Sequence, residues 1–486
     1  MKRRIHMTIN KGAVRRDENG WIYVKISGDA KGRGKQYGTL VAEEILEAVS
    51  EAKQLILLHT GVDWDFFKKD KISILHTWRK HLTEEPFKEF YNEMEGMVQG
   101  VKANKEACAK YPDLNLDVKD LILWNGFEEL TDYWFPTVAG QVYAKLNGDH
   151  PKMVSTHKTF KSFNEGAGDH CSAFIATGSY TRDGKIVMAH NSFTPFEDGN
   201  HMNIIAEIVP NKGNHIIMQS QPGYIHSMTD FYETKCKNGH HLMVTETTIG
   251  GFNAYDSAGV PEFVRIRYAV QYADSLDSFV EKFWRGNNGG YANTWLVGDA
   301  ATSEIMRFEG GLKFYKVDKT TDGYFAGFNA PLDPRIRNFE CSNSGFADIR
   351  RHQGARQVRI PQLMEQYKGK IDNEVAKTVL ADHYDVYLKK ENPCSRTICS
   401  HYELDDRMYM SQPGRPLPFQ PRGAMDGLTA SAADIDRMVL WARSGSSCGM
   451  PFVADDFLKE HPQFEYLRSF LKDRPSQPWT KFQAES

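Results

Sequence analysis

The N-terminal part of the chain repeats apolar residues with the period of a helix. Residues 38–58 place an apolar stripe along one helix face, made of Val41, Ile45, Ala48, Ala52 and Ile56. The run TEEP at 83–86 predicts a helix start, and the apolar positions after it keep the same period. Asp117 and Asp120 predict the cap of a further helix. Apart from an alternating strand at 20–30, we expect roughly the first 140 residues to be mostly helical.

The pattern changes after a polar segment at 145–170, which has neither a helical nor a strand period and predicts a loop. Two helical runs, at 261–284 and 352–381, interrupt a strand-rich remainder, and a last helix is expected at 431–443. The predicted strands are 171–177, 185–190, 203–209, 214–219, 242–247, 293–298, 303–308 and 312–316. Because runs of strands occur with segregated helices, the sequence predicts an α+β fold with a mostly antiparallel sheet.

The composition narrows the class of protein. The 486 residues are 41% hydrophobic and 25% charged, an ordinary globular composition. A net charge of -3 disfavours a nucleic-acid partner, which would require a basic face. No run approaches about 20 apolar residues, so no membrane insertion is expected. The start MKRRIHMTINKG lacks the apolar stretch of a secretory signal, and we expect a cytoplasmic protein. Seven cysteines, an odd number in a long chain, predict no disulfide framework.

One cysteine begins a predicted strand directly after the polar segment. In GAGDHCSAFIATGSYTRDGKIVMAHNSF, residues 166–193, the polar lead-in offers nothing that would bury Cys171. A turn at Asp183–Gly184 returns the chain antiparallel and brings His190 or Asn191 beside that cysteine. A cysteine thiolate is a good nucleophile near neutral pH. This segment alone is equally compatible with a nucleophilic site and with a buried core cysteine beside a hydrogen-bonded histidine.

The run CSAF…AHNSF resembles the phospholipase B-like family of N-terminal nucleophile (Ntn) hydrolases, which is related to the C45 peptidases of the penicillin acyltransferase type. Upstream, GRGKQYG at 32–38 and LILWN at 121–125 resemble the prosegment of the C45 group. Further stretches resemble the family's motifs in the same order, namely LMVTETTIGGFN at 242–253, GGYANTWLVGD at 289–299, YFAGFNAP at 324–331, ICSHYEL at 398–404, PRGAMDGLT at 421–429 and RSGSSCGMPF at 443–452. Each motif is weak alone, but their common order makes the resemblance specific.

This resemblance implies a four-layer αββα Ntn-hydrolase sandwich and a precursor that cleaves itself. The cut would fall between His170 and Cys171. Residues 1–170 would form a helix-rich prosegment ending in a flexible linker, and residues 171–486 the catalytic chain. The new N-terminus would carry an α-amine with a pKa near about 8, which suits a general base at working pH. The two processed chains would remain associated through the apolar helices of the first.

The resemblance also assigns roles to four residues. Cys171 matches the family's nucleophile, and His190 matches a histidine that would orient or polarise the thiol. Asn293 and Asn329 match family asparagines, and an asparagine amide is a suitable oxyanion donor. The sequence leaves open which of the two asparagines serves, and turn or cap roles remain the alternative for both.

Charge near the site and metal binding are weaker signals. Arg396 could supply a positive charge, as an arginine does in related acylases, but a surface or ion-pair role is the more common one for such a residue. His401 stands where the family has arginine, which leaves that role open. Cys236, His240 and His241 lack a further ligand cluster, so we expect neither a metal nor another cofactor.

Three functions follow from these observations. The leading one is an autoprocessed cysteine hydrolase or acyltransferase that cleaves amide bonds of N-acylated small molecules or peptides. The second is a phospholipase B-type hydrolase of lipid acyl esters, and the third is a non-catalytic binding protein that keeps the fold. The expected partner is a small N-acyl or lipid substrate, and a homo-oligomer is compatible with the sequence. Relatives in the family are often lysosomal or secreted.

Overall fold

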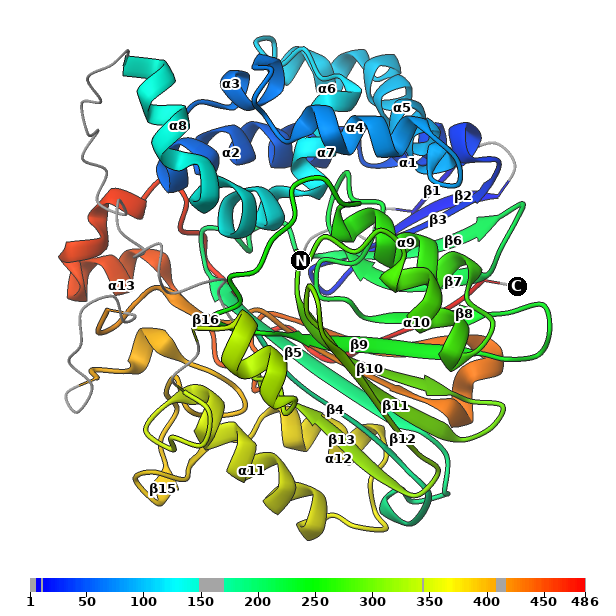
Figure 1. The fold of residues 1–486 in the computed structure, drawn as a ribbon, viewed down its shortest axis with the longest axis vertical. Helices are drawn as coiled ribbons and strands as arrows, with labels where there is room; N and C mark the ends of the chain where they lie inside the picture. The colour runs from blue at the N-terminus through cyan, green and yellow to red at the C-terminus, as the bar shows by residue number, and fades with distance from the viewer. Residues whose placement is uncertain (1–5, 10–11, 148–169, 343–344, 408–416, 486) are drawn as a thin grey trace.

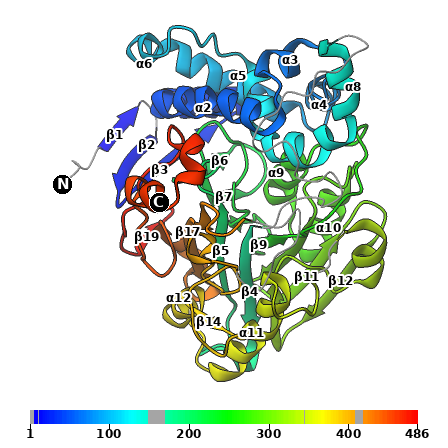
Figure 2. The ribbon, with the colours of Figure 1, turned by 90° about the vertical axis from the view of Figure 1, so that its left-hand side faces the viewer.

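The computed structural model describes residues 6–9, 12–147, 170–342, 345–407 and 417–485. Within these ranges, two β-sheets lie face to face, and helices cover the outer side of each sheet (Figures 1 and 2). The N-terminal helices lie at the top of Figure 1 and α11 at the bottom, with the sheets between them. This arrangement confirms the predicted α+β class.

The larger sheet has the strand order β1–β2–β3–β6–β7–β8–β9–β10–β11–β12. Its described ladders are antiparallel except for the parallel pair of β3 and β6. Its strands are β1 (His6–Ile9), β2 (Ala13–Glu18), β3 (Trp21–Gly28), β6 (Ile204–Pro210), β7 (His215–Ser220), β8 (Tyr232–Lys235), β9 (Leu242–Thr248), β10 (Asn293–Asp299), β11 (Glu304–Gly310) and β12 (Tyr315–Thr320).

The smaller sheet has the order β13–β4–β5–β17–β18–β19, and β16 also pairs with β5. Its strands are β13 (Gly323–Gly327), β4 (Cys171–Thr177), β5 (Val187–Pro195), β16 (Arg422–Ala424), β17 (Asp426–Ser431), β18 (Val439–Ser444) and β19 (Thr480–Gln483). A separate hairpin joins β14 (Tyr384–Asp385) to β15 (Lys390–Glu391).

The helices form two outer layers. The larger sheet is covered by α1 (Ala30–Leu40), α2 (Ala42–Thr60), α3 (Trp64–Lys69), α4 (Leu75–Thr83), α5 (Lys88–Ala103), α6 (Lys105–Lys110), α7 (Val118–Asn125), α8 (Phe135–Asn147), α9 (Glu262–Tyr272) and α10 (Leu276–Trp284). The smaller sheet is covered by α11 (His352–Gln366) and α12 (Asn373–Leu380), and α13 (Ala454–Glu460) follows β18.

Successive side chains of β4 point to opposite faces of its sheet, and both faces are covered, so this strand lies at the centre of the layers. Ala173 and Ile175 pack into the core between the two sheets. Phe174 and Ala176 point the other way and pack with residues of α11 and α12. Every residue of β4 is buried, as expected for a short apolar run covered on both faces. The strand that begins with Cys171 is therefore held rigidly on both sides.

Most predicted elements are confirmed. The strand expected at 171–177 is β4, and the two helical runs at 261–284 and 352–381 each form a pair of helices. At the start of α7, Asp117 and Asp120 form the predicted cap, because each side chain accepts a hydrogen bond from the other residue's backbone N–H. Within the loop expected at 145–170, residues 148–169 lie outside the described ranges.

The helix predicted at 431–443 is wrong. That segment is a short 3₁₀ helix, Ala432–Arg437, followed by β18. Met438 takes a positive φ of 49° between them, which ends the helical turn. Leu440 then lies between Ala430 of β17 and Phe482 of β19. Sheet pairing on both sides overrides the local apolar spacing that favoured a helix.

The N-terminal 170 residues, the predicted prosegment, share a sheet with the rest of the chain. β3 pairs with β6 over seven residue pairs, so the larger sheet crosses from the predicted prosegment into the rest of the chain. Helices α1 and α5 cross closely because glycines face each other, and a Cβ on Gly38 would collide with the Met97 carbonyl. No helix of the described ranges has the length and apolar character needed to cross a membrane.

Candidate active site

Cys171 lies at the meeting point of the two sheets. It is the first residue of β4, and only 2% of its surface is exposed. Its Sγ lies 3.5 Å from Glu246 Oε1 and 3.9 Å from Thr248 Oγ1, and both of these residues belong to β9 of the other sheet. The thiol is therefore surrounded by polar groups instead of the apolar side chains that would pack a structural cysteine.

Asn329 contacts both the sulfur and the backbone nitrogen of Cys171. Its Nδ2 donates to Thr248 O at 2.7 Å and lies 3.8 Å from Sγ, while its Oδ1 lies 3.4 Å from the Cys171 nitrogen. Asn329 has a positive φ of 63°, a region that asparagine enters more readily than most residues. Of the two predicted asparagines, this one lies beside the sulfur.

Asn293 reaches the cysteine through Glu246. It begins β10, where it pairs with Thr248 of β9. With the amide oriented so that its nitrogen faces the carboxylate, Asn293 donates to Glu246 Oε2 at 2.8 Å. Burial raises the pKa of Glu246 well above its usual range, and the neighbouring carboxyl of Asp230 raises it further. Glu246 is thus positioned by Asn293 and can exchange a proton with the thiol.

His190 lies on the same face of the smaller sheet as Cys171. The β4–β5 register pairs Cys171 with Ser192 and Ala173 with His190, one residue away from the predicted register. His190 Nε2 lies 3.9 Å from Glu246 Oε1. Burial lowers the pKa of His190 to about 3, so the ring is neutral at physiological pH. Neither ring nitrogen meets a hydrogen-bond partner among the described residues, which leaves both available to a bound molecule.

The thiol itself is held in its protonated form. Burial raises the pKa of Cys171 well above its usual range, and the neighbouring Glu246 raises it further. A nucleophilic role therefore requires a base that removes the thiol proton during the reaction.

The arginine beside Cys171 is Arg356 of α11, which the sequence analysis missed. Its guanidinium donates to Cys171 O at 2.5 Å and to Asn329 Oδ1 at 2.8 Å. The predicted Arg396 is buried in an ion pair with Asp385 at 2.5 Å and lies 3.7 Å from Asp405. Arg396 therefore takes part in an ion pair, as the alternative expectation had it. The guanidinium that contacts Cys171 and Asn329 belongs to Arg356.

His170 precedes the cysteine and continues the β4–β5 ladder by one residue. Its carbonyl oxygen accepts a hydrogen bond from Phe193 N at 2.5 Å. Its Nε2 lies 4.0 Å from Glu128 Oε2. The peptide bond between His170 and Cys171 is thus held in place on its carbonyl side, and a backbone N–H already polarises that carbonyl.

A small cavity opens on this bond. It has a volume of about 20 Å³, room for one or two water molecules, and its lining includes His170, Cys171, His190 and Glu246. Tyr291 also lines it, and the Tyr291 hydroxyl hydrogen-bonds Thr248 Oγ1 at 2.7 Å.

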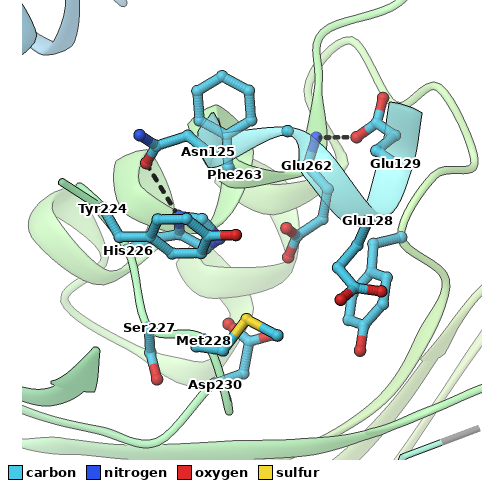
Figure 3. Close-up of a pocket in the computed structure, with 12 residues that line it drawn as sticks. Asn125, Glu128, Glu129, Tyr224, His226, Ser227, Met228, Asp230, Glu262 and Phe263 are labelled. Carbon is cyan, nitrogen blue, oxygen red and sulfur yellow. Dashed lines mark hydrogen bonds between the residues drawn. The ribbon is translucent and has the colours of Figure 1, made fainter. Parts of the chain in front are cut away.

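A second pocket adjoins the first, because Glu128, Met228 and Tyr291 line both. Figure 3 shows Tyr224 lying flat on His226, with ring centroids 4.5 Å apart, near the carboxyl group of Asp230. Burial raises the pKa of Asp230 to about 8. Aromatic faces line this pocket together with buried carboxyl groups whose pKa burial raises, among them Asp230 and Glu262.

Glu246 and Thr248 could have been found from the sequence. Both lie in LMVTETT, where a carboxylate interrupts a short run that is otherwise uncharged, and a buried charge usually needs a reason. Arg356 had no such signal, because one arginine in a helix that contains several is ordinary.

The two facing sheets and the polar cluster around Cys171 define the class of this protein as a layered α+β protein with a buried cysteine site. The chain belongs to the phospholipase B family, whose sequence profile matches residues 29–477. It is 27% identical over 269 residues to phospholipase B of Crotalus adamanteus, covering 49% of this chain and 46% of that protein.

Two further relatives agree with this family. A putative phospholipase B-like 2 of Bos taurus is 30% identical over 181 residues, 33% of this chain and 29% of that protein. Phospholipase B-like protein B of Dictyostelium discoideum is 25% identical over 283 residues, 53% of this chain and 46% of that protein. The match spans less than half the length of each of these relatives.

Proposed function

We propose that this chain is an Ntn cysteine hydrolase, which cleaves its own His170–Cys171 bond and then hydrolyses acyl bonds through a thioester on Cys171. The observation that carries the proposal is the placement of Cys171 at a strand start, with its sulfur and nitrogen both contacting Asn329. The two facing sheets with helices on both outer sides support the four-layer αββα sandwich that this class uses.

Self-cleavage requires the thiol to attack the preceding carbonyl. Cys171 Sγ bonds to the His170 carbonyl carbon, the carbon–nitrogen bond breaks, and the nitrogen takes up a proton to become the free α-amine of Cys171. Phe193 N–H, at 2.5 Å from the His170 oxygen, would stabilise the negative charge that develops there. Glu246 Oε1, 3.5 Å from Sγ, would take the thiol proton in its ionised form, which burial makes the less populated form by raising the pKa of this carboxyl. Water then hydrolyses the thioester and leaves a carboxylate on His170.

After cleavage, the α-amine of Cys171 would act as the general base. Its pKa of about 8 is close to working pH, and a base is needed because burial keeps the thiol protonated. Asn329 Oδ1 would orient the amine, and Asn329 Nδ2 would donate to the oxyanion of the substrate. Arg356 would hold Asn329 in this position from the opposite side.

The two pieces would stay together after the cut. β3 of the first piece pairs with β6 of the second. Glu93 of α5 accepts hydrogen bonds from Arg267 of α9 at 2.9 and 3.0 Å, and both side chains are fully buried. Separating the pieces would expose this ion pair and the apolar core around it, at a cost of many kcal/mol.

The scissile bond of the substrate is proposed to be an amide of an N-acylated small molecule or peptide, since the self-cleavage reaction is itself amide hydrolysis. The second candidate is a phospholipid acyl ester, which the names of the relatives favour. Both reactions pass through the same thioester. The polar pocket of Asp230 and His226 next to the cysteine would receive the part of the substrate beyond the acyl group.

The test compares wild type, Cys171→Ala and the control Cys236→Ala, in which a buried thiol away from the cluster is removed. Wild type and the control should split at 170/171, and Cys171→Ala should remain one inactive chain. Amine release from N-acyl amides and fatty-acid release from phospholipid vesicles then separate the two substrates. A Cys171→Ala protein that still splits, or that still turns over either substrate, contradicts the proposal. A folded wild-type protein that is inactive on both substrates favours the third function, a non-catalytic binding protein.

A further inference from the structure

Four potential metal ligands meet behind strand β5, away from the cysteine site. The ligand atoms of His383, Cys399, His401 and Cys448 all lie within 4.8 Å of one another. They come from three separate segments of the chain. Cys399 and His401 are buried, and the other two are half-buried, so the cluster lies close to the surface. The atom His383 Nε2 is buried and meets no hydrogen-bond partner in the described part of the chain.

Two separations between ligand atoms match the edges of a tetrahedral zinc site. With Zn–S of about 2.3 Å and Zn–N of about 2.0 Å, tetrahedral geometry separates a sulfur from a nitrogen ligand by about 3.5 Å. His401 Nε2 lies 3.4 Å from Cys399 Sγ and 3.5 Å from Cys448 Sγ. These distances also suit S–H···N hydrogen bonds, and they equal the edges that a shared central ion requires.

The surroundings orient the ligands as a metal site does. His401 Nδ1 contacts Glu403 Oε1 at 2.7 Å, which turns its Nε2 toward the two sulfurs. A carboxylate on the second ring nitrogen commonly orients a metal-bound histidine. Met450 N donates to Cys448 Sγ at 3.4 Å, and Ser447 Oγ, whose hydroxyl also faces Leu380 O at 2.6 Å, lies 3.2 Å from Cys399 Sγ. Hydrogen bonds of this kind stabilise thiolates, the form that binds metal.

We propose that His383, Cys399, His401 and Cys448 bind one Zn²⁺ ion in a closed, structural Cys₂His₂ site. Two thiolates and two imidazoles are a ligand set that zinc favours over magnesium or calcium. Because four protein ligands fill the tetrahedron, no position remains for water, so the ion stabilises the fold and takes no part in catalysis. The ligands are spread from residue 383 to residue 448, which explains why no compact sequence motif marked them.

The site connects to the catalytic strands through Asn191. On β5, Asn191 pairs with Ser172, the residue after the nucleophile. Its Nδ2 donates to Leu380 O and Ile398 O at 3.1 Å each and to Ser447 Oγ at 3.0 Å. These three partners belong to the same segments that supply the ligands. The ion would therefore clamp together the loops that support β5 and β4 from behind.

Metal content tests the proposal directly. Protein purified under reducing conditions, without chelator, should contain about one zinc per chain by mass spectrometry of the elements. Cys448→Ser and His401→Ala should lose it, whereas Cys394→Ser should retain it, because Cys394 is a buried thiol of the same region that contacts Asp385 instead. Wild type without zinc, also after incubation with Zn²⁺, or variants that retain it, would overturn the proposal.

Cobalt substitution provides a second measurement that needs no variant. Co²⁺ in wild-type protein should give the strong visible bands of a tetrahedral ion and a thiolate-to-cobalt charge-transfer band, and Zn²⁺ should displace it. The competing arrangement is a disulfide between Cys399 and Cys448, both of which are free thiols in the structure. A disulfide that persists in reduced, folded protein together with a silent cobalt spectrum overturns the proposal.

Discussion

Replacing Asn329 by aspartate keeps the shape of the side chain, removes one hydrogen-bond donor from the cysteine site and adds a carboxyl group that Arg356 can pair with. The acceptor Oδ1 stays in place for Arg356 at 2.8 Å and for the Cys171 nitrogen at 3.4 Å. Aspartate also tolerates the positive φ of 63° at this position. What is lost is the Nδ2 group, which donates to Thr248 O at 2.7 Å and lies 3.8 Å from the sulfur.

Two effects of different size should follow. The Thr248 carbonyl becomes a buried acceptor without its donor, which costs about 1–3 kcal/mol of folding stability. If Nδ2 donates to the oxyanion, its loss raises the barrier by about 3–4 kcal/mol, or roughly a 100- to 1,000-fold drop in rate. The rate effect should therefore exceed what the loss of stability alone could produce in a protein that remains folded.

The assay measures kcat on the substrate that wild type turns over, normalised to folded protein by circular dichroism. Asn214→Asp is the matched control, because Asn214 is buried and donates to Val270 O and Ala273 O at the edge of another helix. Asn214→Asp should lose stability and keep kcat. If Asn329→Asp keeps kcat within about 3-fold of wild type, or both variants lose kcat equally, Asn329 is not the oxyanion donor.

Three further predictions concern stability. Asp230→Asn keeps a hydrogen-bond acceptor but removes a carboxyl whose folded pKa is about 8, against about 3.9 when unfolded. Its contribution to stability is present below pH 4 and is lost as the pH rises to 8, so urea unfolding should find the variant more stable than wild type at pH 7 but not at pH 4. Equal pH slopes of the two proteins would refute this. Gly38→Ala forces a Cβ against the Met97 carbonyl and should lower the free energy of unfolding by about 3 kcal/mol. Gly140→Ala, where the new Cβ meets open space, should not lower it. Equal Tm values for the two variants would contradict the close crossing of α1 and α5. Dialysis against a strong chelator should lower the Tm of wild type and not that of Cys448→Ser, and added Zn²⁺ should restore it; an unchanged wild-type Tm would count against a structural ion.

The elements that sequence reasoning placed correctly are those whose own residues determine them. The β4 strand is bounded by a polar lead-in and a glycine turn, and the cap of α7 is made by Asp117 and Asp120 alone. The segment 431–443 failed because its structure is decided by pairing with β19, which follows more than thirty residues later in the chain. Local spacing contains no information about such a partner.

The lack of information about distant partners also limits what the sequence predicts of the cysteine site. Cys171 was singled out because it stands at a boundary that the sequence itself marks, and Asn329 because of the resemblance. Arg356 comes from a helix whose pattern is unremarkable, so only the packing of α11 against β4 reveals its contact with Cys171. The zinc ligands were missed for the related reason that three distant segments supply them.

The central claim is that Cys171 becomes the N-terminal residue of a catalytic chain. N-terminal sequencing and intact-mass measurement of purified, active wild-type protein test it most directly. The account predicts a new chain that begins Cys171-Ser172-Ala173 and co-purifies with the piece ending at His170. Active protein that remains a single chain, or that is cut at any other bond while Cys171 stays internal, would contradict it.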